Sequence, residues 1–255
     1  MKKVLYFFAA VALLFGVASC QKDKDEPPAE APITTQQAGV YNPGMKICRI
    51  YRQKDNGEKE LQEAWRWKDN KLIEILYGND RYTYTYQNNR LSKMELYGRE
   101  GLYYFSCAYY YEGANFSKIE YDEDGDHDDY TAEFDYKNGK ISSVYVYYES
   151  FQDVIDFTWD GDNVSSVHGD GHTDTFTYDG KNNPYCGSFL IVEGSGGVSL
   201  SKNNVTKAYR NGKLDYEYSY EYNSKGYPVK KIETHYNNDG TICHTNTYYY
   251  EYLED

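Results

Sequence analysis

The stretch Tyr136-Lys-Asn-Gly139-Lys-Ile141-Ser-Ser-Val144 decides the fold class, because variants of it recur along the chain. Each copy has an aromatic residue, a short polar turn and then two hydrophobic residues separated by two others. Internal repetition of this kind indicates one supersecondary unit that cannot bury its apolar face alone. The copies are Trp67–Ile75, Tyr86–Met94, Tyr111–Ile119, Tyr136–Val144, Trp159–Val167 and Tyr222–Ile232.

Between the turns, hydrophobic and polar residues alternate, as in Tyr82-Thr-Tyr84-Thr-Tyr86. A period of two is typical of β-strands. The dipeptides Asn138-Gly139, Asp179-Gly180 and Asn211-Gly212 accept the positive φ angles of tight hairpin turns. The sequence therefore predicts an all-β fold, an antiparallel up-and-down meander of about 12–14 strands in a closed or nearly closed barrel-like sheet.

The N-terminus has the pattern of an export signal. Met1-Lys-Lys3 precedes an apolar run from Val4 to Val17, which is shorter than the roughly 20 residues of a membrane-spanning helix. Residues 1–19 are therefore predicted to be a signal peptide. Val17-Ala-Ser-Cys20 resembles a bacterial lipobox, which implies cleavage before Cys20 and stable membrane anchoring through several acyl chains on Cys20.

The rest of the chain divides into a tether and a domain. Residues 20–39 are rich in proline and charge and lack hydrophobic periodicity, so they are predicted to be a disordered tether. Residues 40–255 are predicted to form a single β-barrel-like domain. Its four cysteines allow two disulfides in three pairings, or free thiols; they are Cys48, Cys107, Cys186 and Cys243.

Charge and the residues behind Cys20 bear on location and partners. After residue 19 the chain has 25 basic and 40 acidic residues, a formal charge of −15, which disfavours nucleic-acid binding. The acidic residues just after Cys20 resemble the export signal of surface lipoproteins in gut Bacteroidetes. This resemblance implies an outer-membrane location facing the cell exterior, with a periplasm-facing lipoprotein as the alternative.

The repeat units are similar to the tyrosine–aspartate repeats of Rhs-type surface proteins. From about residue 40 to 255, the chain resembles a Bacteroidetes lipoprotein family of unknown function with a porin-like fold. The resemblance implies a β-barrel-like domain on the cell envelope and brings no catalytic residues. It rests on the lipobox, the units from Trp67 to Val167, Tyr178-Asp-Gly-Lys-Asn-Asn-Pro184 and Leu200-Ser-Lys-Asn-Asn204. A membrane-spanning pore is not expected, because the second strand face carries charged residues where a pore has an apolar band.

Two stretches are candidate metal sites, for calcium and for zinc. Carboxylates alternate around Gly125 and are typical of an oxygen-rich calcium turn, although their spacing differs from an EF-hand and a solvated hairpin tip is the alternative. They are Asp122, Asp124, Asp126 and Asp128. In the second stretch, a three-residue loop would set His168 opposite His172, with Asp174 on the face of His172. Two imidazoles and a carboxylate can hold zinc with an open position, and metal-free histidines at a hairpin tip are the alternative.

No nucleophile elbow, zinc-protease helix motif or phosphate-binding loop occurs in the sequence. We therefore expect a non-enzymatic surface lipoprotein without a cofactor. Its partners are expected to be the membrane, through the lipid, and a glycan or an envelope protein. The partner would be bound by exposed aromatics among the 32 tyrosines and three tryptophans, such as the loop aromatics Tyr147 and Tyr148. The alternatives are a polysaccharide-acting enzyme centred on one of the candidate metal sites, and a purely structural surface spacer.

Overall fold

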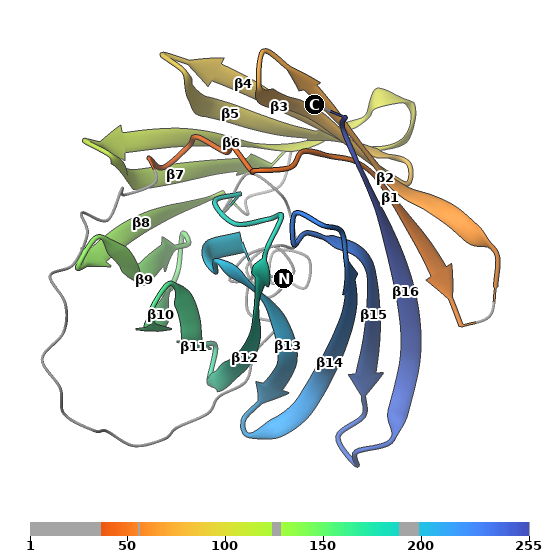
Figure 1. The fold of residues 1–255 in the computed structure, drawn as a ribbon. Helices are drawn as coiled ribbons and strands as arrows, with labels where there is room; N and C mark the ends of the chain where they lie inside the picture. Colours follow the sequence, from red (N-terminus) through yellow and green to blue (C-terminus); the bar gives the residue numbers. More distant parts are fainter. Residues whose placement is uncertain (1–36, 56, 124–128, 189–198, 255) are drawn as a thin grey trace, which may run out of the picture.

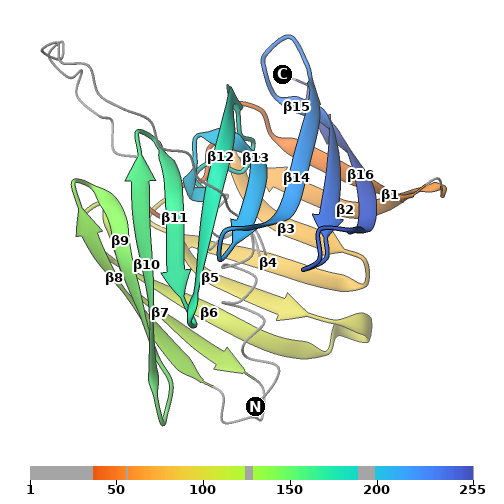
Figure 2. The ribbon, with the colours of Figure 1, turned by 90° about the horizontal axis from the view of Figure 1, so that it is seen from below.

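The structure is a computed structural model that describes residues 37–55, 57–123, 129–188 and 199–254. In these residues, sixteen strands form one antiparallel sheet, and β1 pairs with β16 to close a barrel (Figures 1 and 2). The predicted all-β meander and its closure are confirmed. A 3₁₀ turn, η1 (Arg99–Gly101), lies between β5 and β6. The strands are β1 (Ile47–Lys54), β2 (Lys59–Lys68), β3 (Lys71–Tyr77), β4 (Asp80–Gln87), β5 (Arg90–Tyr97), β6 (Tyr103–Glu112), β7 (Asn115–Glu123), β8 (Tyr130–Lys137), β9 (Lys140–Tyr147), β10 (Gln152–Asp160), β11 (Asn163–Gly169), β12 (His172–Asn182), β13 (Asn203–Arg210), β14 (Lys213–Tyr222), β15 (Pro228–Tyr236) and β16 (Ile242–Tyr252).

The strand count in the described residues exceeds the predicted 12–14 for a topological reason. Each copy of the repeat spans a turn from an even-numbered to an odd-numbered strand. β12 and β13 are instead joined by residues 183–202, which contain no copy, and β16 meets β1 only through closure of the barrel. A count of repeats therefore misses the strand pairs that carry no copy.

A β-bulge beside the tight turns explains the hydrophobic spacing of the repeat. Strand side chains alternate between faces, so hydrophobic residues three apart would normally point in opposite directions. Arg66 pairs with Glu74 but Trp67 pairs with Leu72, which leaves one extra residue in β3. The extra residue lets Leu72 and Ile75 both point inward, where both are buried. The same register shift follows in the next four copies.

The predicted turns are confirmed at two of the three dipeptides. Asn138–Gly139 and Asn211–Gly212 join adjacent strands, with positive φ at all four residues. The turn predicted at Asp179–Gly180 is wrong, because both residues lie inside β12. The Asp179 carboxylate accepts hydrogen bonds from the backbone N–H groups of Lys181 and Asn204, at 2.9 and 3.2 Å, and so joins the end of β12 to the start of β13.

An aromatic residue near the end of each even-numbered strand joins two strands at one end of the barrel. Its polar atom bonds to the backbone near the start of the preceding strand, so each aromatic ring closes the open end of a hairpin. In the first five repeat copies this residue is the one that opens the copy; in the sixth it is Tyr220, while Tyr222 bonds to the Asp179 carboxylate. We call this end of the barrel the anchor end. The opposite end is the loop end, and it contains the loops 78–79, 98–102, 148–151, 170–171, 211–212 and 237–241. The bonds run from Trp67 to Ile47 O, Tyr86 to Leu72 O, Tyr111 to Leu91 O, Trp159 to Ile141 O, Tyr178 to Val164 O, Tyr220 to Val205 O and Tyr252 to Pro228 O, while the Tyr136 hydroxyl accepts from Phe116 N.

Residues 37–46, together with residues 183–188 and 199–202 of the β12–β13 connection, cover the anchor end. The Tyr41 hydroxyl, which is buried, donates to Pro184 O at 2.6 Å. Gly39 O accepts from Leu91 N at 2.9 Å. Gly39 has a φ of +76°, and a Cβ there would lie 2.1 Å from the Tyr111 hydroxyl, so the close approach requires glycine. Residues 189–198 of the connection lie outside the described residues.

The two faces of the wall differ in chemistry. The inner face carries the buried apolar side chains, including Leu91, Met94 and Val146. Ion pairs on the outer face include Arg66–Glu74, Lys93–Glu95, Lys118–Glu120, Lys207–Glu217 and Lys230–Glu221, with N···O distances of 2.5 to 3.0 Å. Cys48, Cys107, Cys186 and Cys243 are all free thiols. Among the described residues, no helix has the length and apolarity needed to span a bilayer.

Candidate functional site

A groove of about 410 Å³ lies on the outer face of β7, β8 and β9. Its position follows from strand alternation: Ala132 and Phe134 of β8 are buried inside, so Glu133 and Asp135 between them point outward. Tyr145 and Tyr147 of β9 rise beside these shorter carboxylates. The lining residues are Glu112, Asn115, Phe116, Ser117, Glu133, Phe134, Asp135, Tyr136, Tyr145 and Tyr147.

The groove combines aromatic surface with hydrogen-bond acceptors. The Tyr145 hydroxyl donates to Asp135 Oδ2 at 3.2 Å, and this bond to a carboxylate raises the pKa of Tyr145. The Tyr147 ring is 39% exposed. Aromatic rings offer apolar faces for stacking, and ionised carboxylates accept hydrogen bonds from hydroxyl groups. A ligand with an apolar ring face and several hydroxyls fits this chemistry.

The β9–β10 loop adds a second aromatic surface beside Tyr147. Phe151 is 52% exposed and stacks on Tyr148, with ring centroids 4.3 Å apart and planes 14° apart. Tyr148 is half-buried and packs against Tyr130 inside the barrel, at 5.5 Å between centroids. Phe151 of the loop and Tyr147 at the end of β9 are therefore exposed to solvent, while Tyr148 stacks on Phe151.

The structure separates the two histidines of the predicted zinc site. The β11–β12 turn contains two residues, Asp170 and Gly171, rather than the predicted three, because both adopt positive φ and form a tight hairpin. Gly169 therefore pairs with His172, and His168 pairs with Thr173. His168 is exposed on the outer face and its Nδ1 lies 2.9 Å from Thr173 Oγ1, whereas His172 shares the inner face with Asp174.

Asp174 instead belongs to an ion-pair cluster on the inner face of β12 and β13. The residue is 1% exposed, and its carboxylate accepts two bonds from the Arg210 guanidinium, at 3.1 and 3.2 Å. His172 Nε2 lies 3.3 Å from Asp174 Oδ2, the oxygen that also accepts the 3.2 Å bond from Arg210. Burial raises the pKa of Asp174, although Arg210 opposes that shift. These contacts with Arg210 and His172 offset the cost of burying the Asp174 carboxylate.

The predicted calcium turn falls mostly outside the described residues. Asp122 lies at the end of β7, and its backbone carbonyl accepts from the Tyr103 hydroxyl at 3.4 Å. Asp129 accepts from Glu123 N at 3.1 Å. Asp124, Asp126 and Asp128 lie outside the described residues, as does Cys20, the predicted lipid site.

Sequence reasoning missed most of the groove. Tyr147 is singled out in the sequence as a loop aromatic, but Tyr145, Glu133 and Asp135 are not. The available signal is alternation: once inward residues are assigned to two neighbouring strands, the outward residues of both share one face. Which outward residues leave a hollow depends on the relative sizes of side chains on three strands.

No family model matches the chain, and no curated protein matches it. Solved structures do resemble it. A porin-like protein from Bacteroides uniformis ATCC 8492 has a TM-score of 0.58 at 11% identity, covering 84% of this chain and all of its own. A porin-like protein from Bacteroides vulgatus ATCC 8482 gives a TM-score of 0.42 at 9% identity, covering 83% of this chain and all of its own. At 11% identity the first likeness is one of fold. The chain therefore shares the barrel fold of a Bacteroides porin-like protein.

Proposed function

We propose that this chain is a non-enzymatic lipoprotein, anchored in the outer membrane through Cys20, that binds glycan in the groove on β7–β9. The groove is the observation that carries the proposal. It has the size of a small-molecule site and sets two tyrosine rings beside two outward carboxylates. Sugar rings combine an apolar face with many hydroxyl donors, and the lining offers a partner for each.

The place of the N-terminal segment supports an orientation for this barrel. Residues 37–46 lie against the anchor end, so a tether from Cys20 reaches the barrel at that end. The anchor end then faces the membrane, and the loop end points away from it. The groove lies on the side wall, where glycan strands of the cell surface can reach it.

The chemistry of the outer wall supports a barrel held in water. Ion pairs such as Lys118–Glu120 and Lys207–Glu217 stand on the outer face of the strands. A lysine or arginine on the lipid face of a membrane barrel costs about 2–4 kcal/mol at the bilayer midplane. A lipid on Cys20 anchors the chain without that cost.

Glycan binding is expected to depend on the two groove tyrosines. The double variant Tyr145→Ala/Tyr147→Ala should lower the affinity for any glycan that the full-length protein binds by at least about tenfold, because stacking surface is lost. A glycan array followed by calorimetry with the bound glycan measures this.

The matched control is Tyr77→Ala, since Tyr77 of β3 is 44% exposed and lies outside the groove. This variant should bind as the unmodified protein does. If the Tyr145→Ala/Tyr147→Ala variant binds glycan as tightly as the unmodified protein does, the groove is not the glycan site. Absence of binding across the array would favour a protein partner or a spacer role.

Lipid anchoring is expected to depend on Cys20. In cells, the Cys20→Ala variant should lose incorporation of labelled fatty acid and should move from the detergent phase to the aqueous phase on phase separation. Cys48→Ala is the matched control, because Cys48 lies in β1 of the barrel. Fatty-acid labelling that persists in the Cys20 variant contradicts the anchor.

A further inference from the structure

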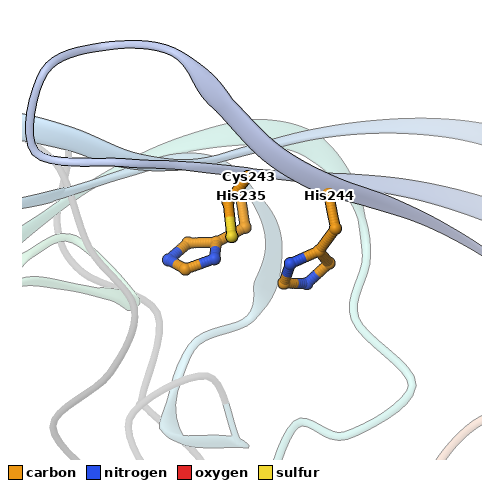
Figure 3. A group of neighbouring side chains, drawn as sticks. All are labelled: His235, Cys243 and His244. Atoms are coloured by element: carbon orange, nitrogen blue, oxygen red, sulfur yellow. The ribbon is translucent and has the colours of Figure 1, made fainter.

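The β15–β16 hairpin at the loop end gathers three side chains that commonly ligate metal ions. Figure 3 shows His235, Cys243 and His244 side by side on the same side of the hairpin. One ligand atom from each residue lies within 4.8 Å of the others. None of the three belongs to the groove or to the sites predicted from the sequence.

A β-bulge brings the cysteine to this face. Adjacent residues of a strand normally point to opposite faces, so Cys243 and His244 should not share one. His235 pairs with His244 but Tyr236 pairs with Ile242, which leaves Cys243 as the extra residue of β16. Bulges that redirect a side chain are frequent next to functional sites. The irregular register is thus what assembles the cluster.

The His235 ring is oriented by groups on the neighbouring strand. Its Nε2 lies 3.3 Å from Asp215 Oδ1, and its ring stacks on Tyr216 at 4.6 Å between centroids. Its Nδ1 is buried and has no hydrogen-bond partner among the described residues. A proton on Nε2, held by the carboxylate, leaves the Nδ1 lone pair free. Carboxylates orient metal-binding histidines in this way in many zinc sites.

We propose that His235 Nδ1, Cys243 Sγ and one ring nitrogen of His244 bind a zinc ion, with Asp215 as a positioning residue. A thiolate and two imidazoles suit zinc and exclude calcium, which prefers oxygen ligands. Tetrahedral zinc with bonds of about 2.0–2.3 Å holds its ligands roughly 3.3–3.8 Å apart, so the three atoms need to draw together by about 1 Å. Cys243 is exposed and the histidines are partly exposed, which gives the side chains room for that movement.

The charge around the cluster favours a divalent cation. A thiolate and two neutral imidazoles leave zinc with one net positive charge, and the Asp215 carboxylate beside His235 offsets it. Three protein ligands leave the fourth position for water or an exogenous donor, the arrangement of reactive rather than purely structural zinc sites.

Metal titration of the purified full-length protein tests the proposal. The protein in detergent and reductant is stripped with a chelator and titrated with Zn²⁺ by calorimetry and with Co²⁺ by absorption. We expect one equivalent of each, and a thiolate-to-cobalt charge-transfer band. Cys243→Ser should abolish the band, and His235→Ala or His244→Ala should weaken Zn²⁺ binding by at least about tenfold. Asp215→Asn should keep the band but lower the affinity by about 10–100-fold.

His168→Ala and Cys48→Ser are the matched controls, and both should bind as the unmodified protein does. A measurement that needs no variant is protection of the Cys243 thiol: Zn²⁺ should slow its alkylation, while Cys48 alkylation stays unchanged. Saturable binding that survives Cys243→Ser and His235→Ala, or that is lost with His168→Ala, overturns the assignment. So does an alkylation rate of Cys243 that Zn²⁺ leaves unaltered.

Discussion

Replacing Lys231 by methionine is expected to lower the free energy of unfolding by about 3–5 kcal/mol at pH 7. Lys231 lies on the inner face of β15, with its ammonium group 2.9 Å from the Glu233 carboxylate and 4.2 Å from the centre of the Tyr248 ring. The two side chains are only 19% and 15% exposed. Methionine fills similar space but leaves the Glu233 charge buried without its cation. Denaturant unfolding at pH 7 measures the change.

Two further variants separate the buried charge from other effects. Lys231→Met/Glu233→Gln should recover most of the loss, because a neutral amide still accepts the Tyr248 hydroxyl that now bonds to Glu233 at 3.3 Å. Lys230→Met is the matched control on the outer face, where Lys230 pairs with Glu221 and that carboxylate is 65% exposed. It should cost under about 1 kcal/mol. Equal losses in the Lys230 and Lys231 variants would contradict the buried pair.

The pair also predicts a pH dependence. Burial alone would raise the pKa of Glu233, but the Lys231 ammonium and hydrogen bonds from Tyr248 and Asn246 hold it below its usual range. A carboxyl group with a lowered folded-state pKa stabilises the fold above its unfolded-state pKa, and that contribution is lost as the pH falls through the folded-state value. In the Lys231→Met variant burial acts without the ammonium, so protonation relieves the cost. The difference from the unmodified protein should therefore shrink between pH 7 and pH 4.

The repeat shows how far sequence reasoning reaches in this fold. The spacing of Ile141 and Val144 and the turn at Asn138–Gly139 predict strands, hairpins and an apolar inner face, because those depend on local chemistry. The same spacing also indicates the bulge. Two inward residues of a regular strand are separated by one residue, whereas Ile141 and Val144 are separated by two. The number of strands could not be predicted from the repeat, because β12 and β13 are joined by a connection that contains no copy of it.

The candidate sites could not be predicted from the sequence for a different reason, because each depends on the register between neighbouring strands. The turn at Asp170 has one residue fewer than predicted, which places His168 on the outer face. His168 therefore pairs with Thr173 rather than with His172. One residue more at Cys243 brings a thiol beside His235, although adjacent strand residues are expected on opposite faces. Single-residue changes of this size carry little signal in one sequence, yet they decide which side chains meet.

The anchor aromatics explain why the repeat opens with tyrosine or tryptophan, and Tyr111 provides the strongest test. Its ring stacks on Phe116 at 5.2 Å between centroids and lies 3.6 Å from the Arg90 guanidinium, while its hydroxyl donates to Leu91 O at 2.5 Å. It also contacts Gly39 of the segment that covers the anchor end. Tyr111→Ala is expected to lower the free energy of unfolding by about 3–5 kcal/mol, because packing and a hydrogen bond are lost together.

Two comparisons apportion that loss. Tyr111→Phe keeps the ring and removes the hydroxyl, so it should cost about 1 kcal/mol. Tyr110→Ala changes the neighbouring tyrosine, which is 42% exposed on the outer face, and should change stability by about 0.5 kcal/mol or less. Chemical denaturation should therefore show the largest loss for Tyr111→Ala, a smaller one for Tyr111→Phe and the smallest for Tyr110→Ala. If Tyr110→Ala lost as much stability as Tyr111→Ala, the specific position of Tyr111 would not matter. The aromatic residue of the repeat would then stabilise the barrel through the general preference of tyrosine for strands, and not through its bond across the open end of the hairpin.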